Sequence, residues 1–288
     1  MSATPAPSLS TGTSVGTCPD SSYLLDNAAA EAPARLAALA EMFDAHTRRH
    51  LLARGVRPGW HCLEVGAGNG SIAEWLAGQV GPSGRVVATD LDPRHLAAVA
   101  ERVGPGLVVA RHDLTRDPLP EGAFDLVHLR LVLVHLEDWA AILARLIRAL
   151  KPGGWLVDEE FDSDSLPPDP AVSPGEVLLP TYRATARLMA ERGFDRRFGR
   201  RLYARLRGAG LDAVGAEGRL EMLDRDAAGT ALIRANWGQL RDALGGGGYV
   251  GATDVDRDLA RLDDPAFLMP SSILWTAWGR RAPSARAA

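Results

Sequence analysis

The sequence has almost no lysine and very little cysteine. Lys151 is the only lysine among the 32 lysine and arginine residues, and alanine and glycine are abundant. This bias is typical of a GC-rich genome, so we do not interpret the arginine excess as phosphate recognition. The two cysteines are Cys18, in an expected loose N-terminus, and Cys62, in an expected buried strand. A disulfide between them is not expected, and a reducing cytoplasm suits the chain.

Membrane and nucleic-acid signals are missing as well. No run of 18 or more apolar residues occurs, so no membrane-spanning helix is expected. Residues 1–22 have neither a basic start nor a continuous apolar core, and we interpret them as a disordered leader and not as a signal peptide. The net charge of -4 is spread along the chain. We therefore expect a cytoplasmic protein that binds neither nucleic acid nor membrane.

Common metal and nucleophile motifs are also lacking. The seven histidines show no ligand spacing with the carboxylates that we recognise, and no Cys pair is present. There is no G-x-S-x-G elbow, and Cys62 lies in an expected buried strand. We therefore predict no metal and no covalent intermediate.

Short apolar runs alternate with helical patterns between about residues 60 and 160. The runs are HCLEV, GRVVATD, LVVARHD, FDLVHLR and GGWLVDEE, with helices expected over 71–78, 93–103 and 137–150. Such runs between helices are typical of parallel strands that are buried on both faces. The pattern predicts an α/β fold with a doubly wound sheet.

Helical patterns flank this region. Apolar residues recur at helical spacing over 28–53, and we assign residues 23–57 to N-terminal cap helices. A connector rich in Pro, Asp and Ser follows Glu160, and we interpret residues 163–198 as a helical lid insertion in a domain spanning 58–288. The insertion alternatively serves as a packing element or as the contact surface of a homodimer. Further helices are expected over 178–193, 199–207 and 226–262, the last interrupted at 245–248, and strands over 211–223 and 267–280.

The stretch LEVGAGNGS, residues 63–71, joins the first strand to the first helix. Glycines at such a turn let the backbone approach a ligand closely. The dinucleotide pattern G-x-G-x-x-G/A requires its third glycine or alanine at Ser71, whereas the glycine here is Gly70. Glu64, at the end of the strand, would repel a pyrophosphate and attract an ammonium or sulfonium group. The turn therefore favours a cationic ligand.

Carboxylates also end the next two strands. Asp90 lies 24 residues after Gly66, where it can accept hydrogen bonds from both hydroxyls of a ribose. The alternative role, capping the following helix, is better assigned to Asp92. Asp113 ends the third strand and can accept from an adenine amino group or serve as a turn residue.

Residues 60–160 resemble the class I S-adenosylmethionine-dependent methyltransferases. LEVGAGNG, ATDLD, RHDL, FDLVHLRLVLVHLED and RALKPGGWLVDEE look like the motifs of that family, in the same order. The resemblance implies a mostly parallel seven-stranded, Rossmann-like sheet with an antiparallel last strand at 267–280. It also implies S-adenosyl-L-methionine as cofactor. The N-terminal helices and the insertion look like bacterial small-molecule methyltransferases of the quinone-biosynthesis and secondary-metabolite type.

The resemblance also implies which residues contact the cofactor. Glu64, Gly66 and Gly68 would lie around the methionine portion, Asp90 would bind the ribose, and Asp113 with Leu114 would hold the adenine. Leu129 would offer its backbone to the amino-acid end. The complete set of implied cofactor-binding residues is Tyr23, Glu64, Gly66, Ala67, Gly68, Asp90, Leu91, Asp113, Leu114 and Leu129.

A methyl acceptor that carries a proton needs a group to receive it, and a histidine suits this role near neutral pH. Ligands of open α/β sheets lie at the carboxyl ends of the strands. His135, which follows the fourth strand, is therefore the candidate base; its alternatives are packing on the sheet or pairing with Glu137 or Asp138. His128 lies within the strand and is expected to be a core residue.

Other residues near these strand ends are candidates for the acceptor pocket. Glu159 or Glu160 could orient the acceptor, or could only bind the lid. Arg130 could receive an acidic substrate group, or could pair with Asp125 or Glu137. Tyr182 and the residues up to Met189 are candidates for a lid that closes over cofactor and acceptor. Trp237 is a candidate aromatic wall for a flat substrate.

The sequence thus predicts in-line methyl transfer from S-adenosylmethionine to oxygen, nitrogen or carbon of a small aromatic or cyclic metabolite. Two alternatives remain open. A nicotinamide-dependent oxidoreductase shares the open sheet, the glycine turn and Asp90. A non-catalytic protein that binds the cofactor and serves a partner is the other.

Overall fold

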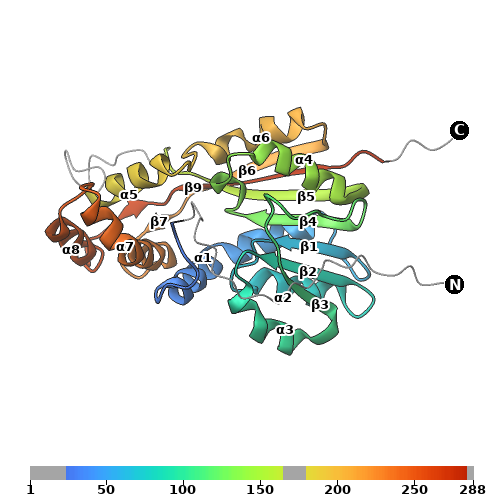
Figure 1. Ribbon diagram of the computed structural model, residues 1–288, viewed down its shortest axis with the longest axis horizontal. Helices are drawn as coiled ribbons and strands as arrows, with labels where there is room; N and C mark the ends of the chain where they lie inside the picture. Colours follow the sequence, from blue (N-terminus) through green and yellow to red (C-terminus); the bar gives the residue numbers. More distant parts are fainter. Residues whose placement is uncertain (1–23, 165–179, 284–288) are drawn as a thin grey trace, which may run out of the picture.

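A computed structural model describes residues 24–164 and 180–283 of the chain. Seven strands form one sheet in the order β3-β2-β1-β4-β5-β9-β6 (Figure 1). Strands β1 to β5 pair in parallel, and β9 is antiparallel to both of its neighbours, β5 and β6. The prediction of a mostly parallel seven-stranded sheet with an antiparallel last strand is confirmed. The strands are β1 (His61–Val65), β2 (Arg85–Asp90), β3 (Leu107–Arg111), β4 (Phe124–Arg130), β5 (Leu150–Asp162), β6 (Asp212–Arg219) and β9 (Ile273–Arg280).

Helices cover both faces of the sheet because neighbouring residues of each strand point to opposite faces. On one face, α4 (Trp139–Ala149) and α6 (Phe198–Gly208) pack on a core that includes Leu63 and Val127. On the other face, α2 (Ser71–Val80), α3 (Ala97–Val103) and the end of α1 (Ala32–Ala53) pack on a core that includes Cys62 and Leu126. The free thiol of Cys62 is buried, as the apolar run predicts. Both faces of the central strands are therefore buried under helices.

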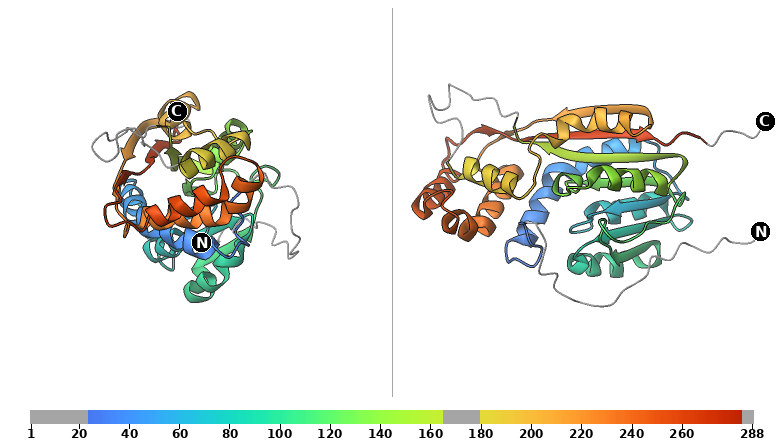
Figure 2. Two further views of the ribbon diagram at one scale, coloured as in Figure 1. Left: turned by 90° about the vertical axis from the view of Figure 1, so that its left-hand side faces the viewer. Right: turned by 45° about the horizontal axis from the view of Figure 1, so that its top comes forward.

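A helical cover lies beyond the carboxyl ends of the parallel strands. It consists of α5 (Pro180–Glu191), α7 (Ala228–Gly246) and α8 (Ala252–Arg261). In Figures 1 and 2 these helices form a separate layer in yellow and orange at one end of the sheet. α7 packs along α1, and α5 packs on α7 and α8. A short ribbon of β7 (Met222–Leu223) and β8 (Met269–Pro270) adjoins this cover.

Some element boundaries differ from the expectations. The expected strand over 211–223 divides into β6 and β7, and the expected strand over 267–280 divides into β8 and β9. Pro270 has no N–H for a longer ladder, which fits the break. The helix α7 also continues into the glycine run as far as Gly246. Of the expected lid over 163–198, the described part is α5 with its flanking residues, and α7 and α8 share the cover with it.

Candidate active site

The glycine turn after β1 has a backbone that only glycine adopts readily. Gly66, Gly68 and Gly70 have φ angles of 64°, 56° and 79°. A Cβ on Gly66 would lie 2.6 Å from Val132 Cγ2, and one on Gly70 would lie 2.9 Å from Leu96 Cδ2. The glycines therefore serve the packing of the turn as well as the close approach of a ligand.

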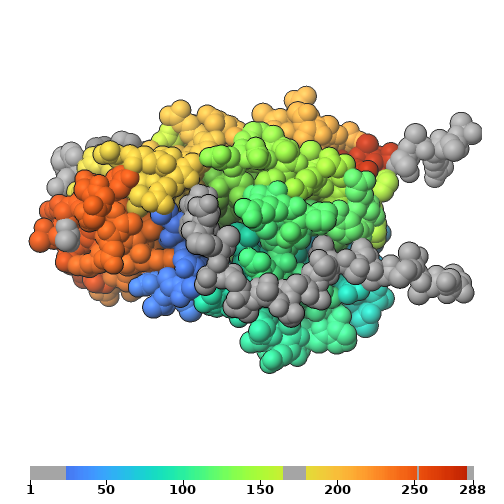
Figure 3. Space-filling view, in the orientation of Figure 1, coloured from blue at the N-terminus to red at the C-terminus, as the bar shows by residue number. Residues whose placement is uncertain are grey.

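One cavity of about 1040 Å³ lies between this turn, α1 and the helical cover. Figure 3 shows these parts from one side, with the teal and green segments of the sheet layer to the right, the yellow and orange helical cover to the left, and α1 in blue between them. Glu64, Asp90 and Asp113, from the carboxyl ends of the adjacent strands β1 and β2 and from the residues after β3, all line it. The sheet order thus brings the three predicted carboxylates to one cavity.

Asp90 fixes the glycine turn from the neighbouring strand. Its Oδ2 accepts a hydrogen bond from the Gly68 N–H at 2.9 Å, and its Oδ1 accepts from the Asp92 N–H at 3.0 Å. Burial raises the pKa of this carboxyl group. Asp92 caps the following 3₁₀ helix η1 (Pro93–Leu96) through the Arg94 N–H, as predicted.

Asp113 is a turn residue whose side chain also lines the cavity. Its Oδ1 accepts from the Thr115 N–H at 2.8 Å and from the Thr115 hydroxyl at 2.6 Å, which is the geometry of a turn residue. The same side chain lines the cavity. The turn therefore holds the carboxylate still where a ligand could reach it.

Glu64 is joined to a buried histidine. Its Oε2 lies 2.6 Å from His128 Nδ1, and His128 Nε2 lies 3.5 Å from Glu159 Oε2. Burial by itself would lower the pKa of His128, but the two carboxylates outweigh it and raise that pKa to about 9. His128 is thus a protonated core residue. The sequence indicates its burial, but not its contact with Glu64.

Glu159 is enclosed between α1, β4 and β9. It is fully buried, does not line the cavity, and accepts hydrogen bonds from the hydroxyls of Thr47 at 2.5 Å and Thr276 at 2.7 Å. Although burial opposes ionisation, these bonds and His128 lower its pKa to about 2. The structure thus places Glu159 away from the cavity lining, with its carboxylate enclosed by α1 and β9.

Glu160 points to the other face and holds a short helix in place. Its Oε1 accepts from the N–H groups of Val132 at 3.0 Å and Val134 at 3.2 Å, at the start of η3 (Leu133–His135). Burial and the nearby Asp158 raise the pKa of Glu160. Glu160 is therefore a positioning residue for the segment that carries His135.

His135 lines the cavity and its ring lies 5.2 Å from that of Phe194. Burial and the charge of Arg35 lower its pKa to about 4. The imidazole is therefore neutral at pH 7 and able to accept a proton.

Arg130 lines the cavity but has a different partner from the two expected. It pairs with Asp44 of α1 at 3.0 Å and donates to the Thr47 hydroxyl at 3.0 Å. Asp125, the expected partner, pairs with Lys151 at 2.6 Å. An acidic group on an acceptor would thus compete with Asp44 for Arg130.

The helical cover supplies aromatic and apolar walls. Tyr182 and Trp237 both line the cavity, and the Tyr182 hydroxyl lies 3.0 Å from Ser272 Oγ. Met189, the last of the expected lid residues, also lines the cavity, as do Phe161 and Phe194, which are not among the sequence candidates. They extend the apolar wall beside His135.

Arg35 is a lining residue that sequence reasoning missed. It is 2% exposed and donates to Leu25 O at 2.9 Å and Asn27 Oδ1 at 2.7 Å. Its only signal is its place four residues before Leu39, on the same side of α1.

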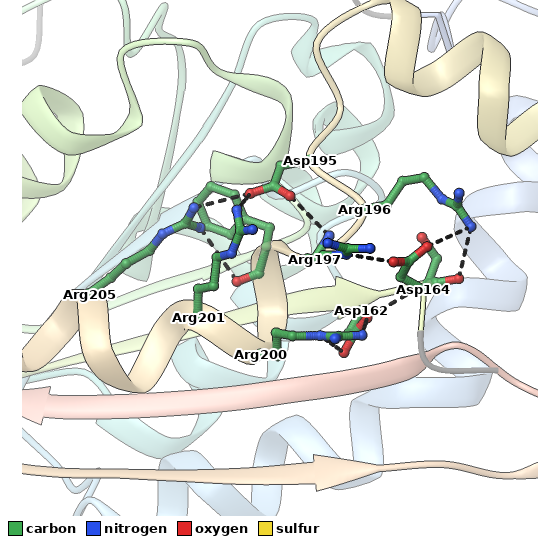
Figure 4. A network of polar contacts seen from close by, with 10 residues as sticks. Asp162, Asp164, Asp195, Arg196, Arg197, Arg200, Arg201 and Arg205 are labelled. Carbon is green, nitrogen blue, oxygen red and sulfur yellow. Dashed lines mark hydrogen bonds and ion pairs between the residues drawn. The ribbon is translucent and has the colours of Figure 1, made fainter. Parts of the chain in front are cut away.

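Ion pairs fasten the segment after α5 to the end of β5 (Figure 4). Arg200 donates to both oxygens of Asp162, at 2.6 and 2.7 Å. Arg196 and Arg197 pair with Asp164 at 3.2 and 2.5 Å. Since Arg196 also lines the cavity, this network fixes one edge of it.

Most of the implied cofactor residues surround the cavity. Leu129 is an exception, because it is fully buried in β4 and does not line it. Tyr23 lies outside the described residues. Those that line the cavity are Glu64, Gly66, Ala67, Gly68, Asp90, Leu91, Asp113 and Leu114.

Two histidines and one carboxylate come together at a place that the sequence spacing did not indicate. His46 and His50 of α1 meet Glu217 of β6, with ligand atoms within 4.8 Å of one another.

In the described parts of the chain, no helix is long and apolar enough to cross a membrane.

Comparison with known proteins gives a match for the part of the chain that contains the glycine turn and the parallel strands. A family model described as "Methyltransferase domain" matches residues 63–158, which include the glycine turn and all five parallel strands except the ends of β1 and β5. Over these residues the chain is similar to methyltransferase domains. The matched region coincides with the motifs that resemble this family in the sequence.

Relatives and solved structures agree with this assignment. Over 110 residues the chain is 37% identical to the ubiquinone/menaquinone biosynthesis C-methyltransferase UbiE of Cupriavidus taiwanensis, which covers 37% of this chain and 45% of that protein. The chain thus matches less than half the length of this curated relative.

Two solved structures share the fold. The Haemonchus contortus phosphoethanolamine N-methyltransferase 2, in complex with phosphomonomethylethanolamine and S-adenosylhomocysteine, has a TM-score of 0.55 at 18% identity, over 86% of this chain and 57% of that one. The YcgJ protein of Bacillus subtilis has a TM-score of 0.53 at 15% identity, over 83% and 100%. At such low identities the likeness shows a shared Rossmann-like fold and nothing more.

Proposed function

We propose that this protein transfers the methyl group of S-adenosylmethionine to a small-molecule acceptor. The observation that carries the proposal is the convergence of Glu64, Asp90 and Asp113 on one cavity at the glycine turn. A carboxylate that ends each of two adjacent strands, with a third just after the next, matches a cofactor with a cationic end, a ribose and an amino-substituted base. The nicotinamide alternative has no comparable support, since no pyrophosphate would favour the place of Glu64.

The charge around Glu64 fits a sulfonium cofactor. With Glu64 and Glu159 ionised and His128 protonated, the three groups carry one net negative charge. A cation in the cavity is therefore attracted, while the buried histidine keeps the two carboxylates from repelling each other. Bound there, S-adenosylmethionine would supply the methyl group, and this chain's residues would align the acceptor and exclude water.

The part of the cavity on the side of the helical cover, away from the glycine turn, fits a small aromatic or cyclic acceptor. Trp237, Tyr182, Phe161 and Met189 give it an apolar wall. The volume of about 1040 Å³ exceeds that of a typical single-ligand pocket, which leaves room for an acceptor beside the cofactor. A C-methyltransferase among the relatives supports an acceptor of this class, with transfer to carbon, oxygen or nitrogen.

One polar atom of α7 offers the acceptor a specific contact. Asn236 lines the cavity, and its buried Oδ1 has no hydrogen-bond partner within the described residues. Since a buried acceptor is costly when unpaired, a hydroxyl or amine of the acceptor is a suitable donor to it. His135, neutral at pH 7, is the candidate to receive the proton of the acceptor.

Calorimetry with S-adenosylhomocysteine and with NADH tests the proposal. We expect binding of S-adenosylhomocysteine and none of NADH, followed by methyl transfer from S-adenosylmethionine in a screen of phenols, amines and quinol-like rings. Binding of NADH alone would overturn the proposed function. Binding of S-adenosylhomocysteine without any methylated product would support the non-catalytic alternative instead.

A further inference from the structure

Three side chains outside the cavity converge where α1 meets β6. His46 and His50 lie one turn apart on α1 and are buried, and Glu217 of β6 is 43% exposed. One ligand atom from each lies within 4.8 Å of the others. His46 and Glu217 line a hollow that is open to solvent and separate from the cavity at the glycine turn.

Hydrogen bonding fixes where the two imidazoles present their lone pairs. Thr276 donates its hydroxyl hydrogen to Glu159 Oε1 at 2.7 Å, so its oxygen accepts from His46 Nε2 at 3.0 Å. This leaves His46 Nδ1 as an acceptor, as assigned from the network. His50 Nε2 in turn lies 3.7 Å from Glu217 Oε2.

The lone pairs point at one atom, Nη2 of Arg49. This nitrogen lies 3.2 Å from His46 Nδ1 and 3.1 Å from His50 Nε2, and it also bonds Glu217 Oε1. A guanidinium Nη2 carries two hydrogens, so it can satisfy only two of the three acceptors at a time. A metal ion held between the three ligand atoms, closer to each than Nη2 lies, would accept a lone pair from all three. The Arg49 side chain is 55% exposed and can turn into solvent.

We propose that His46, His50 and Glu217 bind a divalent transition metal, with Zn²⁺ as the expected ion, in exchange for the guanidinium of Arg49. Two imidazoles and one carboxylate are a common zinc ligand set, with a fourth position left to water. Thr276, bonded to the far nitrogen of His46, orients that ligand.

Metal binding here would tie α1 to the edge of the sheet. Because α1 also lines the cavity through Arg35, Leu36 and Leu39, the ion would hold one cavity wall without taking part in the reaction. We therefore expect Zn²⁺ to raise the melting temperature of the protein.

Titration of the full chain with ZnCl₂, after treatment with chelator, tests the site. We expect one equivalent to bind, and Co²⁺ to give the visible bands of a low-coordinate site. Glu217→Gln should weaken Zn²⁺ binding by at least about 10-fold, since the loss of a ligand costs more than that of an outer partner. Arg49→Met should strengthen it, because the competing cation is gone.

Glu217→Gln and Arg49→Met change exposed side chains, so the fold should persist in both variants. His61→Asn is a matched control that should bind Zn²⁺ as wild type does. His50→Gln is a second ligand variant. The proposal is overturned if wild type binds no Zn²⁺, or if Glu217→Gln and His50→Gln bind it as wild type does. Unchanged affinity in Arg49→Met would overturn the exchange with the guanidinium.

Discussion

His128 Nδ1 lies 2.6 Å from Glu64 Oε2, in the interior of the sheet and beside the candidate cofactor cavity. His128 is fully buried, yet Glu64 and Glu159 outweigh its burial and raise its pKa to about 9. The fold therefore encloses a charged histidine, and it does so by supplying a carboxylate on each side of the ring.

This arrangement predicts a pH dependence of stability. The folded pKa lies above the unfolded value of 6.5, so the stabilisation is complete below pH 6.5 and is lost as the pH rises through about 9. The loss should be on the order of 3 kcal/mol. Denaturant unfolding of wild type and His128→Gln at pH 6.5 and 9 measures it. An equal loss in both proteins would mean that His128 is not the group responsible.

Asp90 should matter to cofactor binding in two ways, because it faces the cavity and holds the Gly68 N–H. We expect Asp90→Ala to weaken S-adenosylhomocysteine binding by about 1–3 kcal/mol, the scale of an unpaired polar partner. Calorimetry gives the value. The control is Asp92→Ala, two residues away, which removes the cap of η1 and should cost less. An unchanged affinity in Asp90→Ala would place the ribose elsewhere.

The sequence predicts the parallel sheet and its carboxylates well, for a physical reason. Strands buried on both faces are continuous apolar runs, and the ligand-facing residues follow each run directly. Glu64, Asp90 and Asp113 are therefore local features. Which face of β5 holds Glu159 is not local, because alternate residues point to opposite sides and α1 decides which side is enclosed.

Pairings between distant segments lie beyond such reasoning. Arg130 pairs with Asp44, which lies 86 residues earlier, and not with the near neighbours expected from the sequence. His46 and His50 have a helical spacing, but Glu217 arrives from an edge strand much later in the chain. The burial of Arg35 likewise depends on the packing of residues 24–27.

Asn236 should affect the acceptor and not the cofactor. Its Oδ1 is buried at the cavity without a partner among the described residues. We expect Asn236→Leu to raise the KM for an acceptor with a hydroxyl or amine by roughly 10-fold, the equivalent of one hydrogen bond. The Kd for S-adenosylhomocysteine should not change. A change in cofactor affinity alone would assign Asn236 to the other half of the cavity.

His135 is the candidate base, and its low pKa sets a specific expectation. A group with a pKa of about 4 stays unprotonated above that pH, so kcat/KM should show no loss from this group until the pH approaches 4. The same low pKa makes it a weak base, and we expect His135→Gln to lower kcat by about 100-fold, the low end for general-base catalysis. Calorimetry with S-adenosylhomocysteine should give the wild-type affinity for this variant.

Glu160→Gln keeps an acceptor oxygen for the N–H groups of η3 and serves as the control for mere displacement of the segment that carries His135. Wild-type turnover in His135→Gln would reject the catalytic role, and would leave alignment of the acceptor as the contribution of this wall.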